Sequence, residues 1–293
     1  MKRSSLLAGL GSWIRDNTRG RKSTQLALLV LVFFFVLAMA AELLVSPNGL
    51  DVNVSQALRP ASSEYPLGTD YVGRDVLALL VYGTRSALLT IVATQVFAFP
   101  LGIGIGMISA YVGGKTDLMI MRLVDAILAF PSVILALALA TALGAGIGTA
   151  IVAVVVAQIG PYARLSRVLT MNVKSQSYFD SAQVAGAGPA RIVLFHIFPN
   201  IRSPLIVQSA FSSAAALLTV AALSFLGVGA QPPSVDWGLM MYESRNYIST
   251  HMQLEVLPGL MIAILILALN TIAEAMRDRL DPKTRTQAGA QVT

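Results

Sequence analysis

Long apolar stretches that carry few or no charges dominate this sequence. Six of them, within 293 residues, have about the length that a helix needs to cross a bilayer core of roughly 30 Å. They are Gln25–Leu44, Ser86–Val112, Leu118–Leu143, Thr149–Leu165, Pro204–Val228 and Leu254–Ala275. The stretches are continuously apolar and lack the alternation that a membrane β-barrel requires. We therefore predict an all-α, polytopic membrane protein with six transmembrane helices.

The composition supports this class. Charged residues make up 12% of the chain, about half of the roughly 25% that soluble proteins use, and hydrophobic residues make up 55%. Disordered proteins, coiled coils and nucleic-acid-binding proteins do not fit these figures. The chain has no Cys, so it offers no disulfide, thiol nucleophile or thiolate metal site. We expect membrane lipid around it and no nucleic acid.

The distribution of Lys and Arg predicts the orientation. Six spans place both termini on one side, and 17 of the 21 basic residues would lie on that side. By the positive-inside rule that side is cytoplasmic, so the net charge of +6 follows from topology. Residues 1–24 are then a cytoplasmic segment, residues 25–276 the transmembrane domain, and residues 277–293 a cytoplasmic tail. The first segment has apolar residues at helical spacing, which fits either an interfacial helix or a frayed basic tail.

Patterns typical of enzymes are missing from the sequence. Gly114-Lys115-Thr116 resembles the end of a P-loop, but Ser109 stands where that pattern needs a glycine. His196 and His251 would lie on opposite sides of the membrane, so they cannot share a metal ion. We predict no catalytic residue, no metal site and no cofactor bound by this chain.

Polar residues within the apolar stretches are candidates for lining a pathway, because a polar side chain facing lipid is expensive. Gln95, Gln158 and Asn270 are the three candidates. Asp125 lies one turn from Arg122, and we expect these two to pair.

Glycine and proline mark other features of the same stretches. The segments 102–106 and 144–148 each contain a GxxxG spacing, which favours close packing between helices. Pro100, Pro131, Pro161 and Pro258 interrupt helical hydrogen bonding, as in moving or cavity-lining helices, although static helix bundles tolerate such prolines too.

The cytoplasmic loop between the fourth and fifth stretches has strong local signals. Ser177 and Asp180 have the spacing of a capping box, with Asp in place of Glu. Gly186 can end this helix in the left-handed conformation, and Pro189 can begin the next, which we expect to end at Pro199. The loop is therefore predicted to form two short helices around a glycine corner, a small rigid protrusion for a partner.

This loop, about residues 167–203, resembles the EAA loop of ABC importer permeases. Asp180-Ser181-Ala182 stands at the EAA triplet, Gly186 at its glycine and Phe198-Pro199-Asn200 at its end. Three more segments narrow the resemblance to C-type subunits of the dipeptide/oligopeptide/nickel permease family. They are Pro66-Leu67-Gly68-Thr69-Asp70 with Gly73-Arg74-Asp75, the stretch 224–233 with Trp237-Gly238, and Arg277-Asp278-Arg279-Leu280-Asp281-Pro282. The sequence departs from the family in having Asp180 for Glu, and Ala273-Glu274 for Gly-Asp.

The resemblance implies a type I ABC importer-like permease fold in a bacterial or archaeal cytoplasmic membrane. It implies four kinds of contact, namely a B-type permease subunit, two ATPase subunits that carry ATP and Mg, an extracytoplasmic solute-binding protein, and lipid. The residues implied to contact an ATPase are Asp180, Ser181, Ala182, Gly186 and Arg191. Those implied to shape the outer mouth are Gly68, Asp70, Gly73, Arg74, Asp75, Gly227, Gly229, Pro232 and Pro233. For Arg74 a local ion pair is an equal alternative, and Trp237 is expected to be an interfacial anchor.

The function implied is that of a permease subunit in an ATP-driven importer, with peptides as substrate. Nickel or a metal chelate is the alternative within the family. A secondary transporter or channel is the alternative outside it, although we find no clear internal repeat of the kind that such transporters show.

Overall fold

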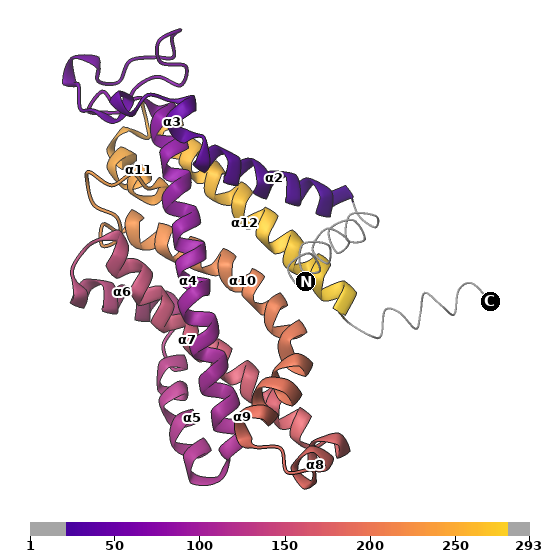
Figure 1. Ribbon diagram of the computed structural model, residues 1–293. Helices are drawn as coiled ribbons and strands as arrows, with labels where there is room; N and C mark the ends of the chain where they lie inside the picture. The colour runs from indigo at the N-terminus through magenta and orange to yellow at the C-terminus, as the bar shows by residue number, and fades with distance from the viewer. Residues whose placement is uncertain (1–21, 281–293) are drawn as a thin grey trace.

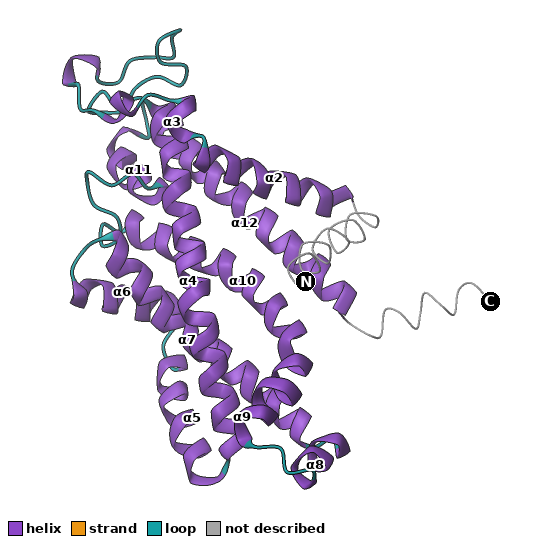
Figure 2. Ribbon diagram, in the orientation of Figure 1, coloured by secondary structure: helices purple, strands orange, loops and turns teal. Residues whose placement is uncertain are grey.

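The computed structural model describes residues 22–280, and within them every regular element is helical (Figure 2). An isolated bridge joins Thr69 and Asp75. The α-helices are α2 Lys22–Met39, α3 Ala41–Leu44, α4 Val76–Val112, α5 Gly114–Leu128, α6 Ser132–Leu143, α7 Ile147–Lys174, α8 Ser177–Val184, α9 Pro189–Arg191, α10 Phe198–Phe225, α11 Trp237–Ser244 and α12 Gln253–Leu280. Short 3-10 helices cover Pro47–Leu50, Val54–Gln56 and Arg245–Tyr247, and a π-helix covers Ile192–Ile197. The predicted interfacial helix and most of the tail lie outside the described residues.

Five helical stretches are long and apolar enough to cross a membrane, namely α2, α4, α7, Pro189–Phe225 and α12. The sixth predicted span is a bent pair, since α5 and α6 meet at 87°. The expectation of one continuous helix over Leu118–Leu143 was therefore wrong. The break falls at Pro131, which has no N–H to donate and which disfavours helical backbone in the residue before it.

Two further expectations about helix ends were wrong. Helix α4 starts at Val76, ten residues before the predicted start at Ser86, because the side chain of Asp75 caps it. The helix that begins at Pro189 does not end at Pro199 but runs on to Phe225. Pro199 lies in the first turn of α10, where a proline is tolerated.

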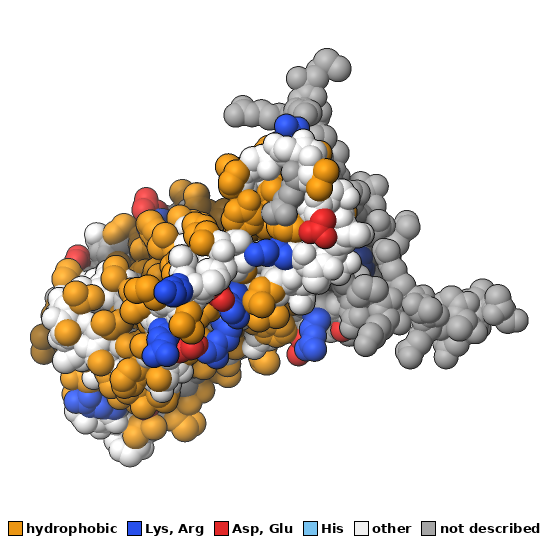
Figure 3. Space-filling view, turned by 90° about the horizontal axis from the view of Figure 1, so that it is seen from below, with side chains coloured by type: hydrophobic (Ala, Val, Ile, Leu, Met, Phe, Trp, Pro, Cys, Tyr) orange, Lys and Arg blue, Asp and Glu red, His pale blue; other side chains and the backbone are white. Residues whose placement is uncertain are grey.

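The helices form an elongated bundle (Figure 1). Helices α5 and α8 lie at its lower end, and the loop between α3 and α4 lies at its upper end, beside α11. Helices α2 and α12 run side by side along one flank. The face seen from below carries Lys and Arg side chains among apolar ones (Figure 3).

Helices α4 and α7 pack closely through glycine. A Cβ on Gly102 would lie 2.5 Å from the Cβ of Tyr162, and one on Gly106 would lie 2.1 Å from the carbonyl oxygen of Ala163. The close packing predicted for 102–106 is thus confirmed. The same prediction for 144–148 was wrong, because Gly144 ends α6 with φ +93° and Cβ atoms at Gly144 and Gly148 would meet no described atom within 4 Å.

Candidate functional site

The protrusion that the sequence predicts on the cytoplasmic side is helix α8 with the glycine corner that follows it. Asp180 lies in the first turn of α8, where a carboxylate is favoured by the helix dipole. Gly186 ends the helix with φ +77°, and the N–H of Ala187 donates to the carbonyl of Ala182 across 3.1 Å. This closure is the Schellman type, so the predicted stop at Gly186 is confirmed. Asp180 and Ser181 are exposed, whereas Ala182 is half-buried.

A buried phenylalanine fixes the other side of α8. Phe179 is 3% exposed and packs in one apolar cluster with Ile103 and Met107 of α4 and Val173 of α7. Phe179 was not among the predicted site residues, although an aromatic residue beside the Asp180-Ser181-Ala182 triplet is a local signal of an amphipathic helix. Helix α8 is therefore held against the bundle through Phe179, while Asp180, Ser181 and Val184 are exposed on its other side.

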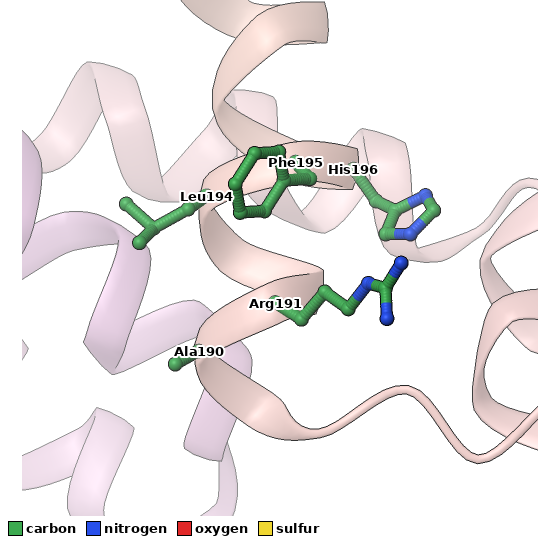
Figure 4. Close-up of a pocket in the computed structure, with 5 residues that line it drawn as sticks. All are labelled: Ala190, Arg191, Leu194, Phe195 and His196. Atoms are coloured by element: carbon green, nitrogen blue, oxygen red, sulfur yellow. The ribbon is translucent and has the colours of Figure 1, made fainter.

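Arg191, the fifth residue of the predicted ATPase contact, lies apart from α8 on the next helix. It lines a surface pocket of about 520 Å³ together with Ala190, Leu194, Phe195 and His196. Arg191 and His196 point to the same side of the helix and Leu194 to the other (Figure 4). The arrangement places a basic side chain at the rim of an apolar surface near the glycine corner.

Asp70 and Arg74, two of the residues predicted to shape the outer mouth, form a buried ion pair. Nε of Arg74 donates to Oδ2 of Asp70 across 2.6 Å, and Nη2 donates to Oε2 of Glu243 in α11 across 2.6 Å. Tyr71 also donates to Glu243, across 3.1 Å. Burial lowers the pKa of Arg74, but attraction by Asp70 and the bonds to Glu243 outweigh it, so that pKa is raised. The predicted local ion pair is therefore present, and Arg74 has a second partner, Glu243, which is distant in sequence. Through these two contacts Arg74 connects the loop before α4 to α11.

The glycines of the same outer segment permit tight backbone contacts. Gly68 and Gly73 have φ +79° and +83°, and a Cβ on Gly73 would lie 1.9 Å from the carbonyl oxygen of Asn53. Asp75 accepts a bond from the N–H of Leu77 across 2.9 Å at the start of α4, and burial raises the pKa of its carboxyl group. These residues shape a compact outer cap in which glycine is required by the fold.

The second outer segment follows α10. Gly227 has φ +82°, and a Cβ on Gly229 would lie 2.3 Å from the Ser224 hydroxyl oxygen. Pro232 and Pro233 are exposed beyond this turn. Trp237 is not an interfacial anchor, because it is 1% exposed and donates from Nε1 to the carbonyl of Leu80 across 3.0 Å. That expectation was wrong.

The three intramembrane candidates lie in different surroundings. Gln158 lines a cavity of about 220 Å³ between α6, α7 and α10, with the polar side chains of Ser132, Gln208, Ser212 and Thr219 around it. Its Nε2 donates to the carbonyl of Ser212 across 2.9 Å.

The other two do not line this cavity. Gln95 accepts a bond from the hydroxyl of Tyr162 across 2.7 Å, and Asn270 is half-buried in α12. Only Gln158 is therefore placed at the cavity. Within residues 22–280, no group of three or more His, Cys, Asp or Glu could hold a metal ion.

Asp125 does not pair with Arg122 as expected. Its carboxylate accepts a bond from Arg164 of α7 instead, in an exposed ion pair. Helix α5 packs against α7, and this packing brings Arg164, which is distant in sequence, into contact with Asp125.

Comparison with known proteins agrees with this architecture. Residues 102–286 match the family model described as binding-protein-dependent transport system inner membrane component. The chain is 36% identical to the dipeptide transport system permease protein DppC of Haemophilus influenzae, over 90% of this chain and 92% of that protein. It is 37% identical to the di/tripeptide transport system permease protein DppC of Pseudomonas aeruginosa, over 79% and 76%. The inward-facing MetNI methionine ABC transporter aligns with a TM-score of 0.53 and 20% identity, over 68% of this chain and 96% of the matched chain.

Proposed function

The chain belongs to the binding-protein-dependent transport system inner membrane components and is a permease subunit of an ABC importer, and we propose that it forms half of a pathway for di- or oligopeptides. The similarity to the two DppC proteins over most of the chain carries this proposal, because their names specify dipeptides and di- and tripeptides. The cavity at Gln158 supports it. Among the described residues that line this cavity none is charged, and its amides and hydroxyls can hydrogen bond to peptide groups.

Family membership implies ATPase and binding-protein partners. We propose the finer assembly, in which a B-type permease completes the pathway and two ATPase subunits carry ATP and Mg. Helix α8 would dock on one ATPase through Asp180, Ser181 and Ala182, of which Asp180 and Ser181 are exposed. Arg191 would add a basic contact beside it. The outer segments with Gly68, Arg74 and Pro232 would face the binding protein.

The mechanism that this assembly supports is alternating access. ATP binding closes the ATPase pair, which moves α8, and the two permease subunits rock so that the cavity opens outward. The chain itself contributes a docking helix and a pathway, and the chemistry of ATP hydrolysis takes place on its partners.

Affinity purification of the tagged chain in mild detergent tests the assembly. The wild type should recover a second permease and P-loop ATPases. A variant with Asp180→Lys and Gly186→Pro should lose only the ATPases, because proline cannot adopt φ +77°. Gly188→Ala is the matched control, since Gly188 has φ −67° and a Cβ there would meet no described atom within 4 Å. A chain that purifies alone and still moves solute would contradict the proposal and favour a secondary transporter.

Uptake by proteoliposomes that hold the complete complex tests the substrate. We expect ATP-dependent uptake of a labelled dipeptide, with competition by unlabelled di- and tripeptides. Nickel uptake without peptide uptake would refute the peptide assignment and support the alternative within the family.

A further inference from the structure

The cytoplasmic end of α7 holds the ends of two other helices through its last basic side chains. Lys174, the last residue of α7, donates from Nζ to the carbonyl oxygens of Ala110 and Tyr111 across 2.8 and 3.0 Å. These carbonyls belong to the final turn of α4, where the helix leaves them without internal partners and where its dipole favours a cation. Lys174 therefore fastens the end of α7 to the end of α4.

Two turns earlier, Arg167 fastens α7 to α5. It binds Asp117 with both ends of its fork, from Nε to Oδ1 across 2.6 Å and from Nη2 to Oδ2 across 2.5 Å. Oδ1 of Asp117 also accepts a bond from the hydroxyl of Ser109 in α4, which is fully buried. The side chains of Arg167 and Asp117 are 27% and 17% exposed. A half-buried bidentate ion pair of this kind constrains both the distance and the angle between two helices.

These contacts lie next to the docking helix. Only Ser175 and Gln176 separate Lys174 from the start of α8. At its far end α5 bends into α6, where Ser132 lines the cavity. A continuous chain of contacts therefore runs from α8 through the end of α7 and along α5 to the cavity wall.

We propose that Arg167, Asp117 and Lys174 are positioning residues that transmit movement of α8 to α5 and α6. With the fork intact, α7 and α5 turn together when α8 is displaced. Without it, α8 and α7 move while α5 stays, and the cavity wall at Ser132 does not follow. The inference rests on the proposed coupling of α8 to an ATPase.

A second ion pair between the same two helices supplies a matched control. Arg164 pairs with Asp125, but their side chains are 56% and 57% exposed, and such surface pairs contribute little. Arg164→Met therefore removes the same type of residue from the same helix without breaking the half-buried bidentate pair between Arg167 and Asp117.

The experiment measures transport per ATP hydrolysed by the reconstituted complete importer. We expect Arg167→Met to lower this ratio at least fivefold while the ATPases still co-purify, and Arg164→Met to stay within twofold of wild type. The exchange variant Asp117→Arg, Arg167→Asp should recover most of the ratio. An unchanged ratio in Arg167→Met would overturn the inference, and so would a folded exchange variant that stays as uncoupled as the single one. A wild-type complex without ATP-dependent uptake would instead overturn the proposed function.

A distance measurement separates transmission from mere stability. Because the chain has no Cys, spin labels can be placed at Leu143 of α6 and Leu267 of α12, which are 55% and 64% exposed. In the wild-type complex, ATP with vanadate should shift the distance between the labels. In Arg167→Met that shift should be lost although the ATPases remain bound. A shift of wild-type size in this variant would refute transmission through the fork.

Discussion

Replacement of Gly106 by alanine should loosen the packing between α4 and α7. The added Cβ would lie 2.1 Å from the carbonyl oxygen of Ala163 and 2.0 Å from the hydroxyl oxygen of Ser166. The hydroxyl can rotate away, but the carbonyl is part of the α7 backbone and can retreat only if the two helices separate. Ser166 would then also lose its bond to the carbonyl of Ile103, which now spans 3.2 Å.

The magnitude follows from two opposing effects. Overpacking a tight site costs about 1–3 kcal/mol, and a backbone obstacle argues for the upper end. Alanine is more favourable than glycine within a helix by about 1 kcal/mol. We therefore expect Gly106→Ala to lower the free energy of unfolding by about 2 kcal/mol. Gly104→Ala is the control two residues away, because a Cβ there would meet no described atom within 4 Å, and this variant should be stabilised by about 1 kcal/mol.

Equilibrium unfolding of the purified full chain with SDS, followed by circular dichroism, measures both variants. We expect the free energy of unfolding to fall in Gly106→Ala and to rise in Gly104→Ala, although the two substitutions are chemically identical and lie on one helix. Equal destabilisation of the two would refute it, because the loss could then not come from contact with α7. A neutral Gly106→Ala would refute it as well.

Four other substitutions test contacts near the predicted outer end. Arg74→Met should destabilise the chain by about 3–5 kcal/mol in the same assay, because it leaves the buried carboxylates of Asp70 and Glu243 without their cation. Arg85→Met is the control, since it removes an exposed ion pair with Glu42 and should cost less than about 1 kcal/mol. Gly83→Ala should disturb Trp237, whose ring would lie 2.6 Å from the new Cβ, and near-ultraviolet circular dichroism should lose intensity. Burial raises the pKa of Asp236, so the folded state takes up its proton before the unfolded state does as the pH falls. Compared with Asp236→Asn, the wild type should therefore gain stability in the same assay as the pH falls through the raised pKa of the folded state.

Local signals in the sequence located most of the membrane helices. Apolar length is a property of a continuous stretch, and five of the six stretches overlap helices that are long and apolar enough to cross a membrane. The stop at Gly186 was equally predictable, because only a residue without a side chain adopts its φ of +77° at little cost. Predicting close helix packing at residues 102–106 required one assumption, namely that the glycines face a neighbouring helix. Helix α7 is that neighbour.

Contacts between residues that are far apart in the sequence could not be predicted from local sequence signals. Asp125 has a cation three residues before it in the sequence, yet it pairs with Arg164, because α7 packs against α5. Arg74 has nearby carboxylates, but its second partner is Glu243 in α11. Tryptophan is a residue type that often lies at the membrane interface. Trp237 is nevertheless buried, because Gly83 leaves room for its ring. In each case the sequence gives the chemical type of the residue and the fold selects its partner.

The contacts on α4 indicate where movement can occur during transport. Gly102 and Gly106 place its middle directly against α7, and Lys174 donates hydrogen bonds to carbonyls in its last turn. By contrast, α7 meets α10 across a cavity of mixed lining, where Oε1 of Gln158 accepts no hydrogen bond from the described residues. Separating α4 from α7 would break many close contacts, while separating α7 from α10 would let water or a peptide group reach an unsatisfied amide. We therefore expect α4 and α7 to move as one body, with the cavity opening on the side of α10.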